Sequence, residues 1–391
     1  MKQKQMIISK IADNIFYLGI IIEVLLVIID KSAYTNPIEG RVFQFTFVLF
    51  LIKVCMTKYS WKEYLLIFLS CLLGAVSYFA TGRNEIIRFV MFMAACKDID
   101  MQKCLKLVFY MTVAGCMVIV LLSVTGVYGA ISLTQDYGRG GEETRYILGM
   151  GHPNALQCMV WALTTLGLYL YAEKMKWYHY FLLIIVNVFF FKLTVSKTSL
   201  IVTLFIIAIA FLATREKQLC WRKVVGCLSI TVTLLSIIFS VVIACNAYRV
   251  YNYAWNIERS PITMIFAKLN DILNGRIRIL VENDRFEGTI STWSIFSKPE
   301  NTYFFDMGWI RLFYWYGILP ACIFIIFLII VMIFCYKKQQ YLALIMIASF
   351  AVYSVIEAHA ISVYLARNYV LFLLGQYWYQ ILCFETRKRM Y

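Results

Sequence analysis

A succession of apolar runs, many of them long enough to cross a lipid bilayer, constrains this chain of 391 residues more than any other feature. A helix needs about 20 apolar residues to span the hydrocarbon core, and an open strand or coil cannot satisfy its backbone there. The chain is 62% hydrophobic and only 15% charged, which excludes an ordinary soluble domain. We therefore predict an all-α polytopic membrane protein, in which residues 1–391 form a single integral membrane domain.

The apolar runs predict about twelve transmembrane helices. Two polar stretches interrupt them, at 126–152 and 246–302, and both are expected to be long loops. Gly317 and Pro320 are expected to break the longest run. The expected spans are 11–29, 42–56, 64–80, 86–96, 107–124, 153–172, 180–191, 200–213, 224–245, 303–336, 341–356 and 361–384.

The distribution of lysine and arginine gives the expected orientation of the chain. Cytoplasmic loops of membrane proteins collect basic residues. The segments expected inside hold 15 lysines and four arginines, whereas the two long loops hold two lysines and seven arginines. Both termini are therefore expected in the cytoplasm and both long loops outside. This orientation explains most of the net charge of +15, and no nucleic-acid partner is expected.

The basic residues of the long loops are mostly arginine, whereas those of the inner segments are mostly lysine. This difference is a separate observation, because the orientation of the chain alone does not require it. The planar guanidinium is suited to fork-like recognition of phosphate. The alternative is that several of these arginines simply pair with acidic residues of the same loops. The seven arginines are Arg139, Arg145, Arg249, Arg259, Arg276, Arg278 and Arg285.

The first long loop ends in a Gly-rich stretch that runs directly into an apolar segment. Pro153 is suited to the first position of a helix, so His152 is the expected N-cap. Helix N-termini of this kind bind phosphates. Arg139 and Arg145 lie just upstream, and Asn154 lies just downstream. We predict an anion site here, in which His152 transfers protons, donates a hydrogen bond or merely caps the helix.

The second long loop and the segments after it supply further candidates. In extended chain, Arg276 and Arg278 would share one face and could contact one anion. Asp306 lies at the start of an apolar segment, where an unpaired carboxylate costs up to about 2.5–3.5 kcal/mol. We therefore expect Asp306 to pair with Arg311 or with a loop arginine. Glu357 is a weaker candidate at the end of the eleventh expected span.

No metal or cofactor is expected. His152, His179 and His359 do not have metal-ligand spacing, and the twelve cysteines lie in or beside apolar runs, as buried thiols do. A few other polar groups lie within or beside the expected spans. His359 and Arg367 are weak site candidates, and Glu23 in the first span has no evident partner.

The run RYILGMGHPN, from Arg145 to Asn154, resembles the R-x-x-x-G-x-x-H-P-N signature of bacterial polysaccharide repeat-unit polymerases. These enzymes are the Wzy type, within the O-antigen polymerase and ligase superfamily. The resemblance covers most of the chain from about residue 85, and at Lys197 the family usually has arginine. Weaker matches are Ser196-Lys197-Thr198-Ser199, Asn274-Gly275-Arg276, and Asp306 followed by Tyr316-Gly317-Ile318.

The resemblance implies a glycosyltransferase-C-like fold and a metal-independent enzyme of the bacterial cytoplasmic membrane. Such an enzyme acts at the outer face on oligosaccharide repeat units linked to undecaprenyl diphosphate, and joins them into capsular or O-antigen-type polysaccharide. A flippase and a chain-length regulator are the expected partners. The expected catalytic residues are Arg145, His152, Arg276 and Asp306, and the expected substrate-binding residues are Arg139, Asn154, Arg278, Arg311 and Glu357.

Three alternatives stay open at this point. The general base can be His152, Asp306 or Glu357. A ligase of the same superfamily would transfer finished polymer to a different acceptor. A flippase or other transporter of lipid-linked sugars would concentrate its ionisable groups around a cavity in the middle of the membrane. Here these groups gather in loops and at helix ends, which favours an enzyme.

Overall fold

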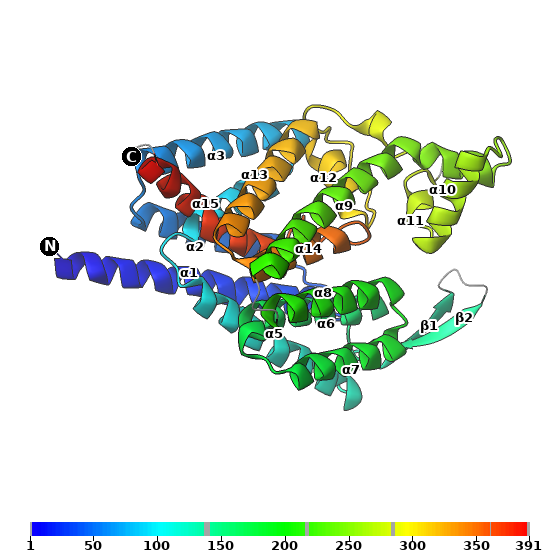
Figure 1. Cartoon of the computed structure of the whole chain (residues 1–391), viewed down its shortest axis with the longest axis horizontal. Helices are drawn as coiled ribbons and strands as arrows, with labels where there is room; N and C mark the ends of the chain where they lie inside the picture. The colour runs from blue at the N-terminus through cyan, green and yellow to red at the C-terminus, as the bar shows by residue number, and fades with distance from the viewer. Residues whose placement is uncertain (1, 137–140, 216–218, 283–285, 360, 389–391) are drawn as a thin grey trace.

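The computed structural model describes residues 2–136, 141–215, 219–282, 286–359 and 361–388 (Figure 1). The chain is mostly helical, and within these ranges eight helices are long and apolar enough to cross a membrane. Length and composition therefore make it a multi-pass membrane protein. The eight are Gln5–Lys31, Trp61–Thr81, Met101–Val124, Pro153–Lys174, Trp177–Thr194, Lys197–Arg215, Cys220–Ala254 and Ile318–Lys337.

The elements follow one another in the order shown by the colours of Figure 1. They are α1 (Lys2–Lys31), α2 (Glu39–Met56), α3 (Trp61–Thr81), α4 (Glu85–Ala95), α5 (Met101–Val124), β1 (Ser132–Asp136), β2 (Glu142–Tyr146), α6 (Pro153–Tyr171), η1 (Ala172–Lys174), α7 (Trp177–Thr194), α8 (Lys197–Arg215), α9 (Leu219–Ala254), α10 (Pro261–Ile272), α11 (Arg276–Ile279), η3 (Ile290–Thr292), α12 (Gly308–Tyr316), α13 (Ile318–Lys337), α14 (Tyr341–Tyr353), η4 (Leu365–Arg367) and α15 (Tyr369–Lys388).

The other expected spans are helices too, but they are shorter or more charged. α4 has 11 residues and α14 has 13, and α2 carries Glu39, Arg41 and Lys53 within its 18 residues. The expected total of about twelve spans therefore stays a prediction.

Aromatic packing joins the first helices of the chain to the last one. The rings of Phe16, Phe50, Phe92 and Phe372, from α1, α2, α4 and α15, form a buried cluster with centroids 5.0–6.2 Å apart. Gly19 allows the Phe50 ring to approach α1, because a Cβ there would lie 2.9 Å from the ring. Close packing of this kind stabilises helix pairs where water provides no driving force.

Gly317 divides the longest apolar run into α12 and α13, which confirms the expected break. Its φ of 96° favours glycine, and a Cβ would lie 2.6 Å from backbone atoms of Phe296. Pro320 lies in the first turn of α13, where its missing N–H leaves no helical bond unmade. The axis of the short helix α12 can therefore differ in direction from the axis of α13.

The first long loop contains a short β-hairpin, which was not predicted from the sequence of this mostly helical chain. β1 and β2 are antiparallel, and Leu133 is the partner of Arg145. The hydroxyls of Thr134 and Thr144 lie 2.8 Å apart across the ladder. β-branched residues facing each other favour strand pairing, which outweighs the glycines that suggested an irregular loop.

The second long loop contains several helical segments, and α9 continues past the loop's expected start at residue 246. α9 continues to Ala254, and α10 and α11 follow. Arg276 and Arg278 lie in α11 rather than in extended chain, so about 200° of helix rotation separates them. Asn274 and Gly275, with φ of 53° and 78°, turn the chain from α10 into α11. The two arginines therefore do not share a face.

Glu23, which had no evident partner in the sequence, is fully buried at a junction of four elements. Its Oε1 accepts a hydrogen bond from Thr46 at 2.6 Å and lies 3.5 Å from Arg88 Nη2. Its Oε2 accepts from the backbone N–H of Leu365 at 3.2 Å. The Arg88 guanidinium also lies 4.0 Å from the centre of the Phe43 ring. These contacts explain how two charged groups are accommodated among apolar helices.

We expect Glu23→Gln to lower the free energy of unfolding by about 1–3 kcal/mol, because Arg88 loses its ion pair and the amide nitrogen cannot accept one of the two hydrogen bonds that the carboxylate accepts. Thermal unfolding of the purified protein in detergent measures this change. Glu173→Gln, at an exposed position in η1, is the matched control and should leave the transition unchanged. Equal transition temperatures for the two variants would contradict the prediction.

Candidate functional site

Seven of the nine predicted site residues line two adjoining polar cavities. The larger cavity has a volume of about 550 Å³ and the smaller cavity about 200 Å³. Because Asn154, Asp306 and Glu357 line both, the two cavities form one continuous site. Of the other predicted residues, the larger cavity takes His152 and Arg311, and the smaller cavity takes Arg145 and Arg276.

Two of the predicted residues are not brought into this site. Arg278 is exposed on α11 and lines neither cavity. Its predicted role required that Arg276 and Arg278 share one face of an extended chain. The chain is helical there, so the two side chains do not share a face. Arg139 lies outside the described residues.

His152 caps α6, as the sequence predicted. Its Nδ1 accepts a hydrogen bond from the backbone N–H of Asn154 at 3.1 Å, and Pro153 opens the helix. Burial lowers the pKa of His152, although the Asp306 carboxylate opposes this shift. The ring is therefore neutral near pH 7, with its proton on Nε2, since Nδ1 is an acceptor. His152 is arranged as a hydrogen-bond donor rather than as a base.

We expect His152→Ala to lower the free energy of unfolding by about 0.5–2 kcal/mol, because the Asn154 amide loses its cap. His152→Ser should restore most of this stability, since serine is a good N-cap. Thermal unfolding of both variants in detergent checks the prediction. An equal loss in the two would mean that the imidazole contributes through packing and not through the cap.

Arg145 is positioned by a carboxylate of its own strand. Its side chain is 5% exposed, and its Nε and Nη2 donate to Glu143 Oε2 at 3.1 and 2.6 Å. The β-hairpin places it in the wall of the smaller cavity. Pairing with an acidic residue and binding of an anion are therefore compatible for Arg145. The ion pair with Glu143 fixes the direction of a guanidinium that lines the site.

Arg276 connects the second loop to the segment between α14 and α15. Its Nη2 lies 3.1 Å from Glu357 Oε1, and its Nε donates to the Ile356 carbonyl at 2.9 Å. Burial and the negative charge of Asp306 raise the pKa of Glu357, whereas Arg276 lowers it. Glu357 is thus already engaged by a cation.

Arg311 does not form the ion pair with Asp306 that the sequence suggested. It donates through Nε to the Phe305 carbonyl at 2.7 Å, and also through Nη2. Its guanidinium lies 3.9 Å from the centre of the Phe304 ring and 4.7 Å from that of Trp315. Among the described residues, Asp306 forms no ion pair and accepts no hydrogen bond. Its carboxylate therefore lines both cavities without a fixed partner.

The end of α1 contributes two charged residues to the site that were not predicted from the sequence. Asp30 and Lys31 line the larger cavity and pair at 2.8 Å. Arg367, a weak candidate, lies 3.9 Å from Asp30 and donates through Nε to His359 Nδ1 at 3.1 Å. Asp30 and Lys31 are charged residues at the end of an apolar run. The same feature made Glu357 a site candidate, so it could also have indicated these two residues.

The charge of the combined site favours an anionic ligand. Within the described part of the chain, six cationic side chains and three carboxylates line the two cavities. Clefts lined mainly by one sign of charge concentrate ligands of the opposite sign. The cations are Lys31, Arg145, Lys197, Arg276, Arg311 and Arg367, and the carboxylates are Asp30, Asp306 and Glu357.

No group of three or more histidine, cysteine, aspartate or glutamate side chains suited to a metal ion occurs among the residues that the structure describes. No protein-family model, curated protein or solved structure matches the chain. The function is therefore inferred from the chemistry of the site and from the resemblance of its loop to a known signature.

Proposed function

We propose that this chain is a polysaccharide polymerase that acts on oligosaccharide repeat units linked to undecaprenyl diphosphate. The observation that carries the proposal is the convergence of Arg145, Arg276, Asp306 and Glu357 on two adjoining cavities at the N-terminal end of α6. A site with six cations at the N-terminus of a helix suits a diphosphate, and its position at helix ends suits a lipid-borne substrate.

The first chemical requirement is stabilisation of the leaving group. In the proposed reaction the bond between the anomeric carbon and the diphosphate oxygen breaks, so negative charge develops on the diphosphate. Arg145, Lys197 and Arg276 line the smaller cavity and would bind that charge. The ion pairs with Glu143 and Glu357 hold two of these guanidiniums in place before the substrate arrives.

The second requirement is a base for the acceptor hydroxyl, whose oxygen forms the new bond to the anomeric carbon. Of the three candidates, His152 uses Nδ1 in the helix cap, and Glu357 is paired with Arg276. Asp306 lines both cavities and is the carboxylate left to take the proton. We assign Asp306 as the general base and His152 as a hydrogen-bond donor.

The proposal includes the cellular setting of the reaction. The two cavities face the outer side of the bacterial cytoplasmic membrane, and both termini lie in the cytoplasm. The fold belongs with the glycosyltransferase-C-like membrane enzymes. A flippase that delivers the lipid-linked unit and a protein that regulates chain length are the partners such an enzyme requires.

The two other candidate functions are a transporter and a ligase. A transporter would place its ionisable groups around a cavity in the middle of the membrane. The buried pair of Glu23 and Arg88 lines neither cavity, and Glu23 is bound by Thr46 and by the backbone of Leu365. A ligase would use the same leaving-group chemistry, and only its acceptor would differ.

Reconstitution of the purified protein into liposomes with lipid-linked repeat units tests the proposal. A polymerase should produce longer lipid-linked oligosaccharides and release one undecaprenyl diphosphate for each linkage formed. Chromatography of the saccharides and mass spectrometry of the lipids measure both products. Release of the lipid without longer chains, or no reaction at all, would argue against a polymerase.

A further inference from the structure

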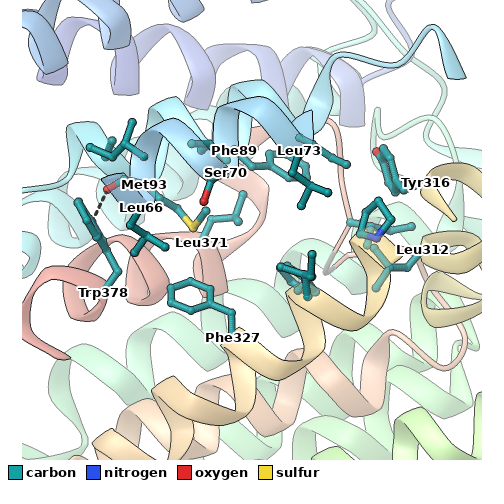
Figure 2. A pocket seen from close by; sticks show the side chains of 18 residues that line it. Leu66, Ser70, Leu73, Phe89, Met93, Leu312, Tyr316, Phe327, Leu371 and Trp378 are labelled. Atoms are coloured by element: carbon teal, nitrogen blue, oxygen red, sulfur yellow. Dashed lines mark hydrogen bonds between the residues drawn. The ribbon is translucent and has the colours of Figure 1, made fainter. Parts of the chain in front are cut away.

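An apolar groove of about 200 Å³ lies beside the polar site (Figure 2). α3 lines one side and α12 and α13 line the other, and residues of α4 and α15 complete the lining. Trp378 closes one end of the groove, where its indole N–H donates to the Met93 carbonyl at 3.0 Å. Apart from Ser70 and the Tyr316 hydroxyl, the described lining is aliphatic or aromatic.

The walls of the groove are helices that contact lipid if the chain spans a membrane. α3 and α13 are both candidate membrane spans. Leu66 and Ile323, which line the groove from the two sides, are 37% and 42% exposed. The groove is therefore accessible from the hydrocarbon between α3 and α13.

The short helix α12 separates the groove from the larger polar cavity. Arg311 and Trp315, one turn apart, line the cavity, whereas Leu312 and Tyr316 line the groove. Ile361 lines both spaces. A cationic cavity and an apolar groove thus adjoin across a single turn of helix, which matches a molecule with a diphosphate at the end of a hydrocarbon chain.

The Tyr316 hydroxyl is an independent indication of a ligand. Its side chain is 1% exposed, and within the described chain the hydroxyl has no hydrogen-bond partner. A buried hydroxyl without a partner costs free energy, so such groups are rare in native proteins. A ligand oxygen at this end of the groove would satisfy it.

We propose that the groove holds the first part of the polyprenyl chain of the lipid-linked diphosphate, and that this lipid enters from the bilayer between α3 and α13. This inference rests on the proposed function. The stretch from Leu66 to Leu73 covers about 10 Å along α3, so the groove takes the units nearest the diphosphate and the rest of the chain stays in the bilayer. The diphosphate then lies beyond α12, in the polar site that the two cavities form together.

Photo-crosslinking with benzoyl-phenylalanine at position 327, where it replaces a phenylalanine that lines the groove, tests the groove directly. Ile326 is the matched control position, because it is 56% exposed on the same helix and does not line the groove. The full chain is placed in phosphatidylglycerol nanodiscs that contain a small fraction of undecaprenyl diphosphate. Relative to phosphatidylglycerol, polyprenyl adducts should be enriched about tenfold or more at position 327 compared with position 326. Equal ratios at the two positions would overturn the proposal.

Two variants connect the groove to turnover in the liposome reaction. Ser70→Trp fills the groove and should raise KM for the lipid-linked unit about tenfold, whereas Leu69→Trp should leave it unchanged. Tyr316→Phe removes only the hydroxyl and should raise KM about threefold without loss of stability. Unchanged KM in both Ser70→Trp and Tyr316→Phe would overturn the groove assignment and leave the polymerase proposal standing. Enriched adducts at position 327 without any polymer would support the groove assignment and argue against the polymerase proposal.

Discussion

Arg276→Ala is expected to reduce the polymerisation rate by a factor of about 10²–10³, the usual effect of removing one donor from a site where negative charge develops. Arg276 lines the smaller cavity, and its guanidinium is held by Glu357 and by the Ile356 carbonyl. Loss of this side chain removes a cation from the proposed leaving-group site and also frees Glu357, whose negative charge would repel a diphosphate. Initial rates in liposomes with a lipid-linked repeat unit measure the effect.

Two comparisons make this prediction specific. Arg276→Lys keeps the charge but not the planar fork, so its rate should fall between those of the wild type and Arg276→Ala. Arg259→Ala removes an exposed arginine that lies outside both cavities and should keep the wild-type rate. A wild-type rate for Arg276→Ala would contradict the assigned role. Thermal unfolding of each variant separates a loss of chemistry from a loss of folded protein.

Asp306→Asn is expected to reduce the rate by a factor of about 10²–10⁴, because the amide has nearly the shape of the carboxylate and cannot accept the proton of the acceptor hydroxyl. Glu357→Gln should have a smaller effect, since Glu357 serves to position Arg276. Asp271→Asn, an exposed change in α10, is the matched control. The same liposome reaction, run with saturating substrate, provides the rates.

The opposite ranking would contradict this assignment of the base. If Glu357→Gln were inactive and Asp306→Asn were nearly normal, proton transfer would belong to Glu357. If both variants were nearly normal while His152→Ser was inactive, the imidazole would be the base and its role as a cap would be secondary. Each ranking thus identifies one of the three candidates.

Local features of the fold were predictable because they depend on backbone chemistry within a few residues. Pro153 set the start of α6 and His152 its cap, and Gly317 set the break between α12 and α13. The hairpin of the first loop and the helices of the second were not predicted, since polar composition does not distinguish an irregular loop from an ordered surface segment. The placement of Arg276 relative to Arg278 was wrong for that reason.

The composition of the site was only partly predictable. Residue type and position at the expected outer face selected Arg145, Arg276 and Glu357, which lie in β2, in α11 and in the segment between α14 and η4. Their meeting depends on how β2, α11 and the segment after α14 pack, and a single sequence does not determine that packing. Asp30 and Lys31 were not predicted because they end α1 beside a short polar turn, whereas the signals that indicated a site lay in and beside the two long loops.

The lipid-linked saccharides of a strain that lacks this chain provide the most direct test of the central proposal, that the protein joins repeat units. Extraction of the lipids, followed by mass spectrometry of the attached saccharide, gives the length distribution. A polymerase predicts that single lipid-linked repeat units accumulate and that long polymer disappears, and that the wild-type gene restores the polymer while Arg276→Ala does not. Accumulation of long lipid-linked polymer, or an unchanged length distribution, would contradict the proposal.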